Sequence, residues 1–369
     1  SLDMVKYIYK NLSLTIKRRY MIKKIKLAFF SLLSLAMVSS AYADITFVSW
    51  GGAYTAAQQK GYINNWNGKV NVENYNGGLG EIKAQVESGN VTWDVVDILP
   101  DQGVTGCDEG LFVKLDQSEF IDDMIAGPVS ECVAPQIFWA YTAFYSKSAF
   151  PGKKPKTIKD FFDVKKFPGK RAIHTWANAT IEMALVADGV KAKDVYKVMS
   201  TQEGIDRAFA KLDTIKDHVI FWSAGSKPLE MISSGEAVMA LAYNGRIGAA
   251  ILTDGKDFDY IWDATVLEQE YLAIPRGSKN EAEARKFVAH ASTAESLAGV
   301  TKHITYAPMR KSALKVVQKG EPWFHNGVDV LPHVPTNKKI IKKAIIADPM
   351  WWADNGAEVS ERFGAWKGN

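Results

Sequence analysis

Motifs that would mark a secreted enzyme are missing from this sequence. Its six histidines include no pair with the His-x-x-x-His spacing of a metal site. It has no Gly-x-Ser-x-Gly nucleophile elbow and no phosphate-binding loop. Asp94 and Asp97 lie three residues apart on an expected buried strand and therefore face opposite sides, which is poor geometry for a carboxylate dyad. We interpret His174 as a structural histidine, and we expect no enzyme activity, no metal and no cofactor.

The apolar run nearest the N-terminus is too short to cross a membrane. Residues 27–38 fall short of the roughly 20 residues that a bilayer requires. This run follows Met21 and three lysines and precedes Ala-Tyr-Ala at 41–43, which is the order of a secretory signal peptide. No cysteine stands at the cleavage site, so a lipid anchor is not indicated. We interpret residues 1–43 as an upstream extension (1–20) and a signal peptide, and we expect a periplasmic protein.

A basic excess is absent once this leader is removed. The leader holds eight of the 45 Lys and Arg residues and one of the 41 Asp and Glu residues, so the formal charge falls from +4 to −3. This balance does not favour nucleic acid as a partner. The remaining 326 residues are enough for two lobes with separate cores, and they contain all 11 tryptophans.

Cysteine is scarce: the chain has only Cys107 and Cys132. In an exported protein an even pair is usually a disulfide. The segment between them contains no histidine that could complete a metal site. We therefore expect a structural disulfide, which would contribute about 3 to 4 kcal/mol by constraining the unfolded chain.

A strand, a tight turn and a helix are expected at the start of the mature chain. The alternating apolar residues 46–49 are followed by Gly51 and Gly52, which permit a sharp turn, and then by a helical apolar pattern. Trp50 and Tyr54 then stand at the carboxyl end of the strand, where open α/β sheets bind ligands. Two aromatic faces suit an organic cation. The alternative, equally weighted on this stretch alone, is that both rings pack in the core.

Strands and helices alternate along the mature chain, which predicts an α/β fold with a mostly parallel sheet. The expected strands are 70–75, 93–99, 171–174, 219–222 and 237–243, and the expected helices are 80–88, 178–187, 202–214, 228–234 and 246–252. Residues 137–145 are apolar and too long for one ordinary strand, so they are expected to pass from one lobe into another. Near 268–275 the chain is expected to cross back. The tail, 337–366, is expected to be helical.

Seven short segments resemble those of periplasmic solute-binding proteins of ABC importers, in the branch that binds spermidine and putrescine. They are Ser49–Tyr54, Trp93–Val96, Phe167–Arg171, Gly235–Val238, Ala242–Gly245, Leu272–Pro275, and Trp351-Trp352 with Arg362-Phe363. The resemblance implies two α/β lobes, a hinge of crossing strands and a ligand cleft between the lobes. The lobes would comprise 44–142 with 272–305, and 143–271 with 306–369.

The same resemblance implies which residues line the cleft. Carried over position by position, they are Trp50, Tyr54, Thr175, Trp176, Tyr243, Glu268, Glu270 and Tyr306. Tyr243 replaces a tryptophan of the family, so the aromatic character is kept. Glu270 stands where polyamine binders place an acid, directly before the Leu-Ala-Ile-Pro segment.

Two departures from the polyamine pattern change the expected ligand. The loop 175–180 contains no carboxylate, whereas polyamine binders place acids there. Arg246 begins a helix whose N-terminus should face the cleft, and both features would repel a polyamine but attract a carboxylate. The alternative for Arg246 is a surface ion pair.

We therefore expect a small ligand with a cationic head and a carboxylate. The aromatic residues would enclose the head, Glu268 or Glu270 would neutralise it, and Arg246 would bind the carboxylate. An ω-amino acid such as γ-aminobutyrate and a betaine-type or sulfonium solute both fit, with a slight preference for an amine; a polyamine is the second choice. The expected partner is an inner-membrane ABC permease, although the sequence does not separate transport from sensing. A monomer is expected.

Overall fold

One mixed sheet runs through the part of the chain that the computed structural model describes, residues 43–319 and 322–368. The expected leader, 1–43, lies outside these residues except for Ala43. The strands are β1 (Ile45–Ser49), β2 (Val70–Asn74), β3 (Val95–Ile98), β4 (Ala134–Ser146), β5 (Arg171–His174), β6 (Val219–Trp222), β7 (Met239–Tyr243), β8 (Phe258–Ala273), β9 (Ala307–Pro308) and β10 (Ile345–Ile346). Their order is β2-β1-β3-β8-β4-β7-β5-β6, with β9 beside β4 and β10 beside β8.

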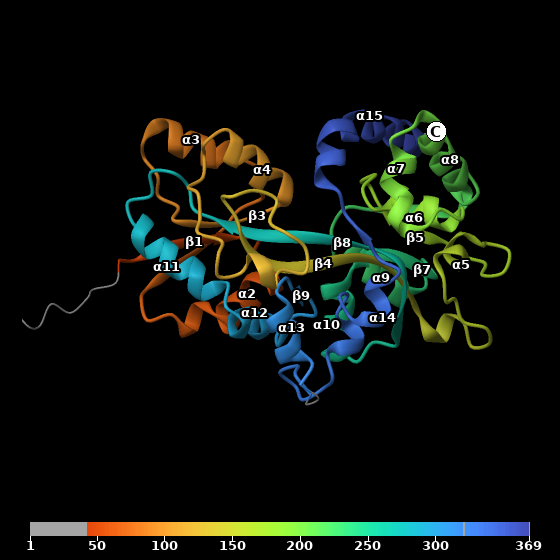
Figure 1. Ribbon diagram of the computed structural model, residues 1–369. Helices are drawn as coiled ribbons and strands as arrows, with labels where there is room; N and C mark the ends of the chain where they lie inside the picture. Colours follow the sequence, from red (N-terminus) through yellow and green to blue (C-terminus); the bar gives the residue numbers. More distant parts are fainter. Residues whose placement is uncertain (1–42, 320–321, 369) are drawn as a thin grey trace, which may run out of the picture. The chain divides into compact units, whose positions relative to one another are not determined.

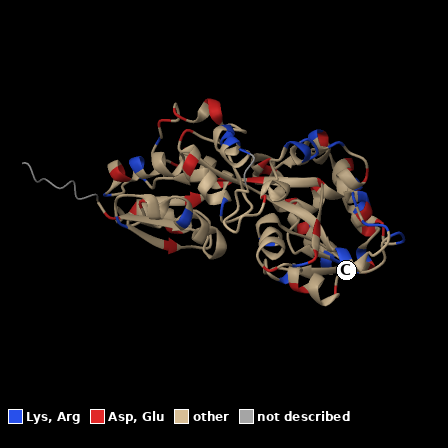
Figure 2. Cartoon of the chain, turned by 90° about the horizontal axis from the view of Figure 1, so that it is seen from below, with Lys and Arg blue, Asp and Glu red and all other residues tan. Residues whose placement is uncertain are grey.

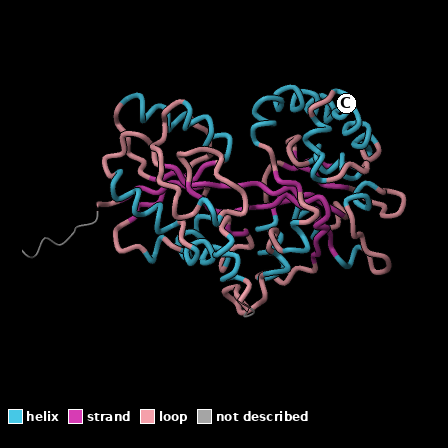
Figure 3. The backbone as a smooth tube through the Cα atoms, in the orientation of Figure 1, coloured by secondary structure: helices cyan, strands magenta, loops and turns pink. Residues whose placement is uncertain are grey.

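Helices pack on the sheet, as the tube in Figure 3 shows. They are α2 (Gly52–Gly61), α3 (Gly80–Ser88), α4 (Pro100–Asp108), α5 (Ile158–Phe162), α6 (Thr180–Ala187), α7 (Val195–Met199), α8 (Gln202–Asp213), α9 (Lys227–Ser234), α10 (Asn244–Leu252), α11 (Glu281–Ala291), α12 (Ala294–Thr301), α13 (Lys311–Val317), α14 (Lys338–Ile341) and α15 (Pro349–Gly368). The expected α/β alternation is confirmed, but the tail is not one helix, because β10 separates α14 from α15.

The long strands β4 and β8 cross from one lobe to the other and account for the mixed character of the sheet (Figure 1). Within the lobes β1 pairs in parallel with β2 and β3, and β5 pairs in parallel with β6 and β7. β4 and β8 run antiparallel to each other, and they pair antiparallel with β7 and β3, respectively. The expectation of a mostly parallel sheet therefore holds inside each lobe and fails at the crossing strands.

Two hydrophobic clusters form the cores of the two α/β lobes. One cluster draws its buried residues from 45–140 and 267–334, and the other from 141–266 and 345–366. Both crossing strands pass from one cluster to the other. The segment 307–334 packs with the N-terminal strand, so the cores favour assigning it to the first lobe, whereas the sequence suggested the second. The lobe boundaries remain a proposal.

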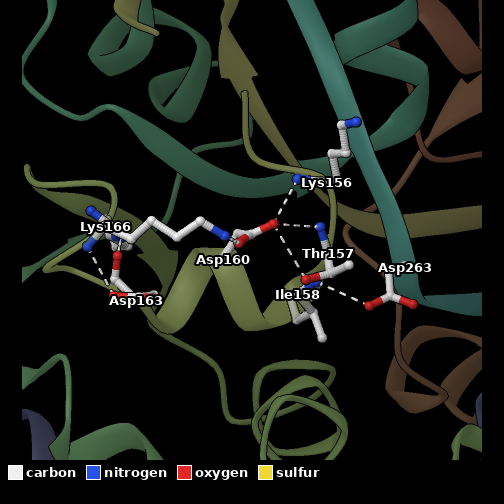
Figure 4. A network of polar contacts seen from close by, with 8 residues as sticks. Lys156, Thr157, Ile158, Asp160, Asp163, Lys166 and Asp263 are labelled. Atoms are coloured by element: carbon white, nitrogen blue, oxygen red, sulfur yellow. Dashed lines mark hydrogen bonds and ion pairs between the residues drawn. The ribbon is translucent and has the colours of Figure 1, made fainter. Parts of the chain in front are cut away.

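The second lobe is anchored to β8 through the start of α5 (Figure 4). The Asp160 carboxylate accepts hydrogen bonds from the backbone amides of Lys156 (2.8 Å) and Thr157 (3.1 Å), which caps the helix. Lys166 forms an ion pair with the same carboxylate at 2.5 Å. Asp263 of β8 accepts a hydrogen bond from the Ile158 amide at 3.1 Å. The crossing strand thus satisfies a helix N-terminus directly.

The expected disulfide is confirmed. Cys107, at the end of α4, is bonded to Cys132, just before β4, with 5.7 Å between the two Cα atoms. The bond joins a helix on the first lobe to the start of a crossing strand.

Candidate functional site

A cavity of about 610 Å³ lies between segments of the two lobes. This volume is within the range of small-molecule sites. Its lining comes from the β1–α2 turn, the crossing strands, the loops after β5 and β6, helix α10 and the segment before β9. The lining residues are Trp50, Gly51, Gly52, Ala53, Tyr54, Leu99, Trp139, Trp176, Ser226, Leu229, Glu230, Tyr243, Gly245, Arg246, Ala249, Ala250, Asp254, Glu270, Ile304 and Tyr306.

The turn between β1 and α2 places Trp50 on the cavity wall. Gly51 has φ 82°, a left-handed conformation that glycine adopts without strain, and its amide donates to Thr55 Oγ1 at 2.8 Å. The Trp50 ring packs on Tyr75, with 5.0 Å between centroids and 34° between planes. A Cβ built on Gly77 would stand 2.5 Å from Trp50 Cζ3, so the indole also rests on the Gly77 backbone. One face of Trp50 is thereby supported by protein.

Aromatic rings meet edge to face around the rest of the cavity. Tyr54 lies 5.6 Å from Tyr306 with 72° between the ring planes. Trp139 lies 5.4 Å from Tyr243 with 79° between the planes. Such pairs hold each ring in one orientation. The cavity therefore has fixed aromatic faces and edges on several sides.

His174 holds the loop that carries Trp176. The Trp176 amide donates to His174 Nδ1 at 2.9 Å, and the two ring centroids are 4.0 Å apart. Burial, and to a smaller extent Lys367, lowers the pKa of His174 to about 4, so the imidazole is neutral. Trp176 itself is 58% exposed, which is unusual for tryptophan. His174 thus has the structural role that the sequence suggested.

An acidic pair lies at one end of the cavity. Glu270 lines it, and Asp97 lies fully buried beside it. Burial raises the pKa of Asp97 to about 6, although hydrogen bonds from Gln58 and Ser49 favour its ionised form. Burial and the charge of Asp97 raise the pKa of Glu270 well above its ordinary value. No ion pair to either carboxyl occurs within residues 43–319 and 322–368.

Arg246 supplies the opposite charge. It lies in the first turn of α10, and its guanidinium forms no ion pair with any described residue. A Cβ built on Gly225 would stand 2.7 Å from Arg246 Nε, so the side chain packs against that backbone. Burial raises the pKa of Tyr306, Glu270 raises it further, and Arg246 lowers it. The Tyr306 hydroxyl is therefore influenced by both Glu270 and Arg246.

Seven of the nine residues expected from the sequence line the cavity: Trp50, Tyr54, Trp176, Tyr243, Arg246, Glu270 and Tyr306. Thr175 and Glu268 do not. Thr175 is engaged by the scaffold, since its amide donates to the Trp222 carbonyl at 3.0 Å and its carbonyl accepts from Lys367 Nζ at 2.7 Å. Burial, followed by the charges of Glu182 and Asp101, raises the pKa of Glu268 to about 8. Its interactions therefore lie with a second group of acids beside the cavity.

Three contributions were missed by sequence reasoning. Trp139 lines the cavity from β4, although its segment was recognised only as a crossing strand. Ser226, Leu229 and Glu230 enter the lining from the start of α9, a helix that gave no sequence sign of a role in binding. Asp97 was considered only as a partner of Asp94. Its actual neighbour Glu270 is remote in sequence, so no local motif could have revealed the pair.

We also searched the described part of the chain for a metal site and for a membrane-spanning helix. No group of three or more His, Cys, Asp or Glu side chains there is arranged to hold a metal ion. Among the helices assigned in 43–319 and 322–368, none combines the length and apolarity needed to cross a bilayer. Basic and acidic residues are interspersed over the view in Figure 2.

Comparisons with known proteins agree with this geometry. Residues 52–330 match the family model of the bacterial extracellular solute-binding proteins. The chain is 38% identical over 345 residues to the γ-aminobutyric acid-binding protein of Pseudomonas aeruginosa, covering 91% of this chain and 95% of the relative. A solved GABA receptor has 31% identity and a TM-score of 0.74, covering 88% of this chain and 98% of that one. The PBP MotA from A. tumefaciens B6, solved with glucopine, has 28% identity and a TM-score of 0.74, covering 88% and 100%.

The overall fold is thus shared with these solved relatives. The family match extends over most of the described chain and includes all of the segments that line the cavity except Trp50 and Gly51. The chain belongs to the bacterial extracellular solute-binding proteins, the substrate-binding components of ABC transporters.

Proposed function

We propose that this chain binds a small ω-amino acid, with γ-aminobutyrate as the leading candidate, and delivers it to an ABC permease. One observation carries the proposal: Glu270 and Arg246 line the same cavity, and neither forms an ion pair with a described residue. A ligand with opposite charges at its two ends would neutralise both. The γ-aminobutyrate binders among the relatives support this choice.

The carboxylate of the ligand is proposed to bind Arg246. A guanidinium can donate two parallel hydrogen bonds to a carboxylate, and the N-terminus of a helix favours negative charge. Both features coincide at the start of α10, where Gly245 and Arg246 line the cavity.

The cationic head is proposed to lie beside Glu270 and against the aromatic rings. Each ring face contributes about 0.5 to 2 kcal/mol of attraction for a cation. A primary ammonium donates hydrogen bonds, whereas a quaternary head has no donor for the carboxylate oxygens of Glu270. This difference favours an amine over a betaine-type or sulfonium solute.

A polyamine is the second candidate, and one observation favours it. Asp97, Glu268 and Glu270 form a group of buried acids that acts through mutual charge effects. A ligand with two ammonium groups would find more than one acid within this group. The guanidinium of Arg246 would repel such a ligand, which is why we rank it second.

Calorimetric titration with γ-aminobutyrate, glycine betaine, putrescine and spermidine tests the proposal. We expect γ-aminobutyrate to bind most tightly. Arg246→Ala should weaken its binding by roughly 10- to 100-fold, the effect of losing hydrogen bonds to a charged group, and should leave or improve putrescine binding. Arg207→Ala is the control, since that arginine is paired with Asp188 outside the cavity. Tight putrescine binding by the wild type, with no binding of zwitterions, would refute the proposal.

The cellular setting follows from the same reasoning. We propose a monomer in the periplasm, exported by the signal peptide expected at 1–43, that docks on an inner-membrane permease. Neither catalysis nor nucleic-acid binding is part of this proposal. A purely sensory role would use the same cavity, and transport assays in a strain that lacks the protein would separate the two roles.

A further inference from the structure

Sheet geometry places the carboxyl groups of Asp97 and Glu270 side by side. β3 and β8 are antiparallel neighbours in which Asp97 is opposite Leu272. Residues two positions apart on a strand share a face, so Glu270 points to the same side as Leu272 and lies diagonally across from Asp97. Asp97 is 0% exposed and Glu270 is 7% exposed. Two acids therefore meet in a site with almost no access to water.

Neutral groups alone make hydrogen bonds to this pair. Asp97 Oδ2 accepts from Gln58 Nε2 at 2.6 Å and from Ser49 Oγ at 3.2 Å. Asp97 Oδ1 and Glu270 Oε2 are buried and have no hydrogen-bond partner among the residues that the structure describes. Two buried carboxylate oxygens thus remain available for a donor.

The groups that face the pair from neighbouring elements do not neutralise it. They are Tyr54 and Tyr62 from the α2 segment, Tyr75 after β2, Tyr306 before β9 and the acid Glu268 of β8, on which Asp101 of α4 acts in turn. Burial raises the pKa of each of these tyrosines, so all four are uncharged at neutral pH. The basic group Arg246 acts on Tyr306.

Two carboxyls at such close range and without a cation do not both ionise near neutral pH. Like charges in a site of low dielectric repel strongly, and the pair titrates as one unit. The direction of the pKa change is upward for both residues, which agrees with this expectation. A cation placed between the two groups would reverse the balance and favour the doubly ionised form.

We propose that Asp97 and Glu270 form one proton-exchanging receptor for the cationic head of the ligand. In the empty cavity the two carboxyls hold one proton between them, and an ammonium group that binds there displaces this proton into solvent. Glu270, which lines the cavity, then accepts N–H donors from the ammonium, Asp97 stays ionised behind it, and the released proton is taken up by buffer. Asp97 is a positioning residue, because it acts through Glu270. The inference rests on the proposed function only in requiring a ligand with an ammonium head.

The arrangement also selects the class of head group. A primary ammonium offers three N–H donors, enough for the open oxygen of Glu270 and for further acceptors. A quaternary ammonium offers none, so it would leave both carboxylates ionised and unsatisfied, or leave the proton in place. Amines should therefore exchange a proton on binding, and betaines should not.

Proton exchange can be counted by calorimetry on the mature chain. γ-Aminobutyrate and putrescine are each titrated near pH 6, 7 and 8 in phosphate, imidazole and Tris buffers, whose ionisation enthalpies differ. Released protons protonate the buffer, so the slope of the observed enthalpy against the buffer's ionisation enthalpy, with its sign reversed, is the number of protons released. We expect a slope approaching minus one at the lowest pH and approaching zero as pH rises. In the window of full release the affinity should increase by about tenfold per pH unit.

The two ligands separate this inference from the proposed function. Failure of γ-aminobutyrate to bind, together with proton release on putrescine binding, would refute the proposed ligand and support the carboxyl pair. Binding of either amine with no dependence on buffer at any of the three pH values would overturn the pair.

Variants identify the groups that release the proton. Asp97→Asn leaves a single ionisable carboxyl, so the slope should be near zero and the pH profile should flatten. Glu182→Gln is the matched control, because Glu182 is a buried acid with a raised pKa that does not line the cavity, and its slope should equal that of the wild type.

A milder substitution tests the same pair in case Asp97→Asn does not fold. Ser49→Ala removes the hydroxyl that lies 3.2 Å from Asp97 Oδ2 and 2.6 Å from Oε1 of Gln58, the other donor to Asp97, so it weakens the support of the ionised form. Proton release should then persist to higher pH than in the wild type. An unchanged slope in Asp97→Asn, or an unchanged pH window in Ser49→Ala, would contradict the proposal.

Discussion

The indole of Trp50 rests directly on the backbone of Gly77. A Cβ at position 77 would stand 2.5 Å from Cζ3 and 2.8 Å from Cη2 of that ring, too close for any real side chain. The contact fixes one face of Trp50 and leaves the remainder of the ring to the cavity that it lines. A residue remote from the ligand thus determines where the first aromatic wall stands.

Gly77→Ala should therefore displace Trp50 and weaken ligand binding by at least about tenfold, the loss of one cation–ring contact of 0.5 to 2 kcal/mol or more. Gly78→Ala is a matched control: Gly78 also has a positive φ, 87° against 81°, but a Cβ there meets nothing within 4 Å. Both variants carry similar backbone strain, so a difference in calorimetric affinity between them reports the displacement of Trp50. Equal affinities would show that the Trp50 position does not matter.

The Trp139 indole is expected to donate a hydrogen bond to the ligand. Its Nε1 is buried and has no partner among the described residues, although the ring lines the cavity. Trp139→Phe keeps an aromatic ring and removes the donor, so affinity should fall by about tenfold or more if the acceptor is a carboxylate.

The control for this change is Trp222→Phe. Trp222 Nε1 is likewise buried without a partner in the described part of the chain, but Trp222 does not line the cavity. Affinity should be nearly unchanged in that variant. A similar loss in both variants would point to a general packing effect rather than to a donor at Trp139.

Ligand binding should shift the fluorescence of Trp176. This residue is 58% exposed in a cavity wall, so a ligand that covers it, or closure of the lobes around it, should move its emission to shorter wavelength. Trp176→Phe should remove most of the shift. Trp262→Phe, at a tryptophan stacked on Tyr260 outside the cavity lining, should retain it. A shift that survives in Trp176→Phe would contradict this assignment.

The pH dependence of stability should reveal the buried Glu182. Burial raises its pKa to about 7. Hydrogen bonds to Oε1 from Trp352 (2.7 Å) and Tyr196 (2.9 Å) act in the opposite direction and lower the pKa. Because the folded-state pKa lies above that of the unfolded chain, the folded protein binds more protons, and stability decreases as pH rises from the ordinary range of glutamate through about 7.

Glu182→Gln keeps an oxygen acceptor for both donors and removes the ionisation. Between about pH 5 and pH 8 the wild type should lose roughly 1 to 3 kcal/mol more free energy of unfolding than this variant. Urea denaturation at the two pH values measures the difference. Glu203→Gln, at an exposed acid, provides the control. Parallel pH profiles for wild type and Glu182→Gln would show that Glu182 ionises normally.

Much of the fold was accessible from local sequence patterns. The glycine pair at 51–52 marked the β1–α2 turn, and the patterns at 80–88, 171–174 and 219–222 gave the bounds of α3, β5 and β6 as observed. Hydrophobic periodicity and turn residues act over short distances, so a single sequence contains them. The crossing role of 137–145 was also visible, because an apolar run of that length does not fit one ordinary strand.

The composition of the cavity was only partly accessible. Trp50, Tyr54 and Tyr243 stood in segments with a family likeness, and Arg246 was recognised as a departure from the polyamine pattern. Thr175 and Glu268 were carried over by position and do not line the cavity. Small rotations of a loop or strand decide which neighbour faces the ligand, and motif matching carries no information about them.

The amino-acid sequence by itself determined the alternation of strands and helices, the cysteine pair and the supply of aromatic and charged groups. Only the tertiary structure decided that Asp97 of β3 meets Glu270 of β8 and that Trp139 enters the cavity from a crossing strand. The physical reason is the range of the interactions. Local patterns set secondary structure, whereas the pairing of distant strands brings buried acids together. The role of each acid in binding depends on that pairing.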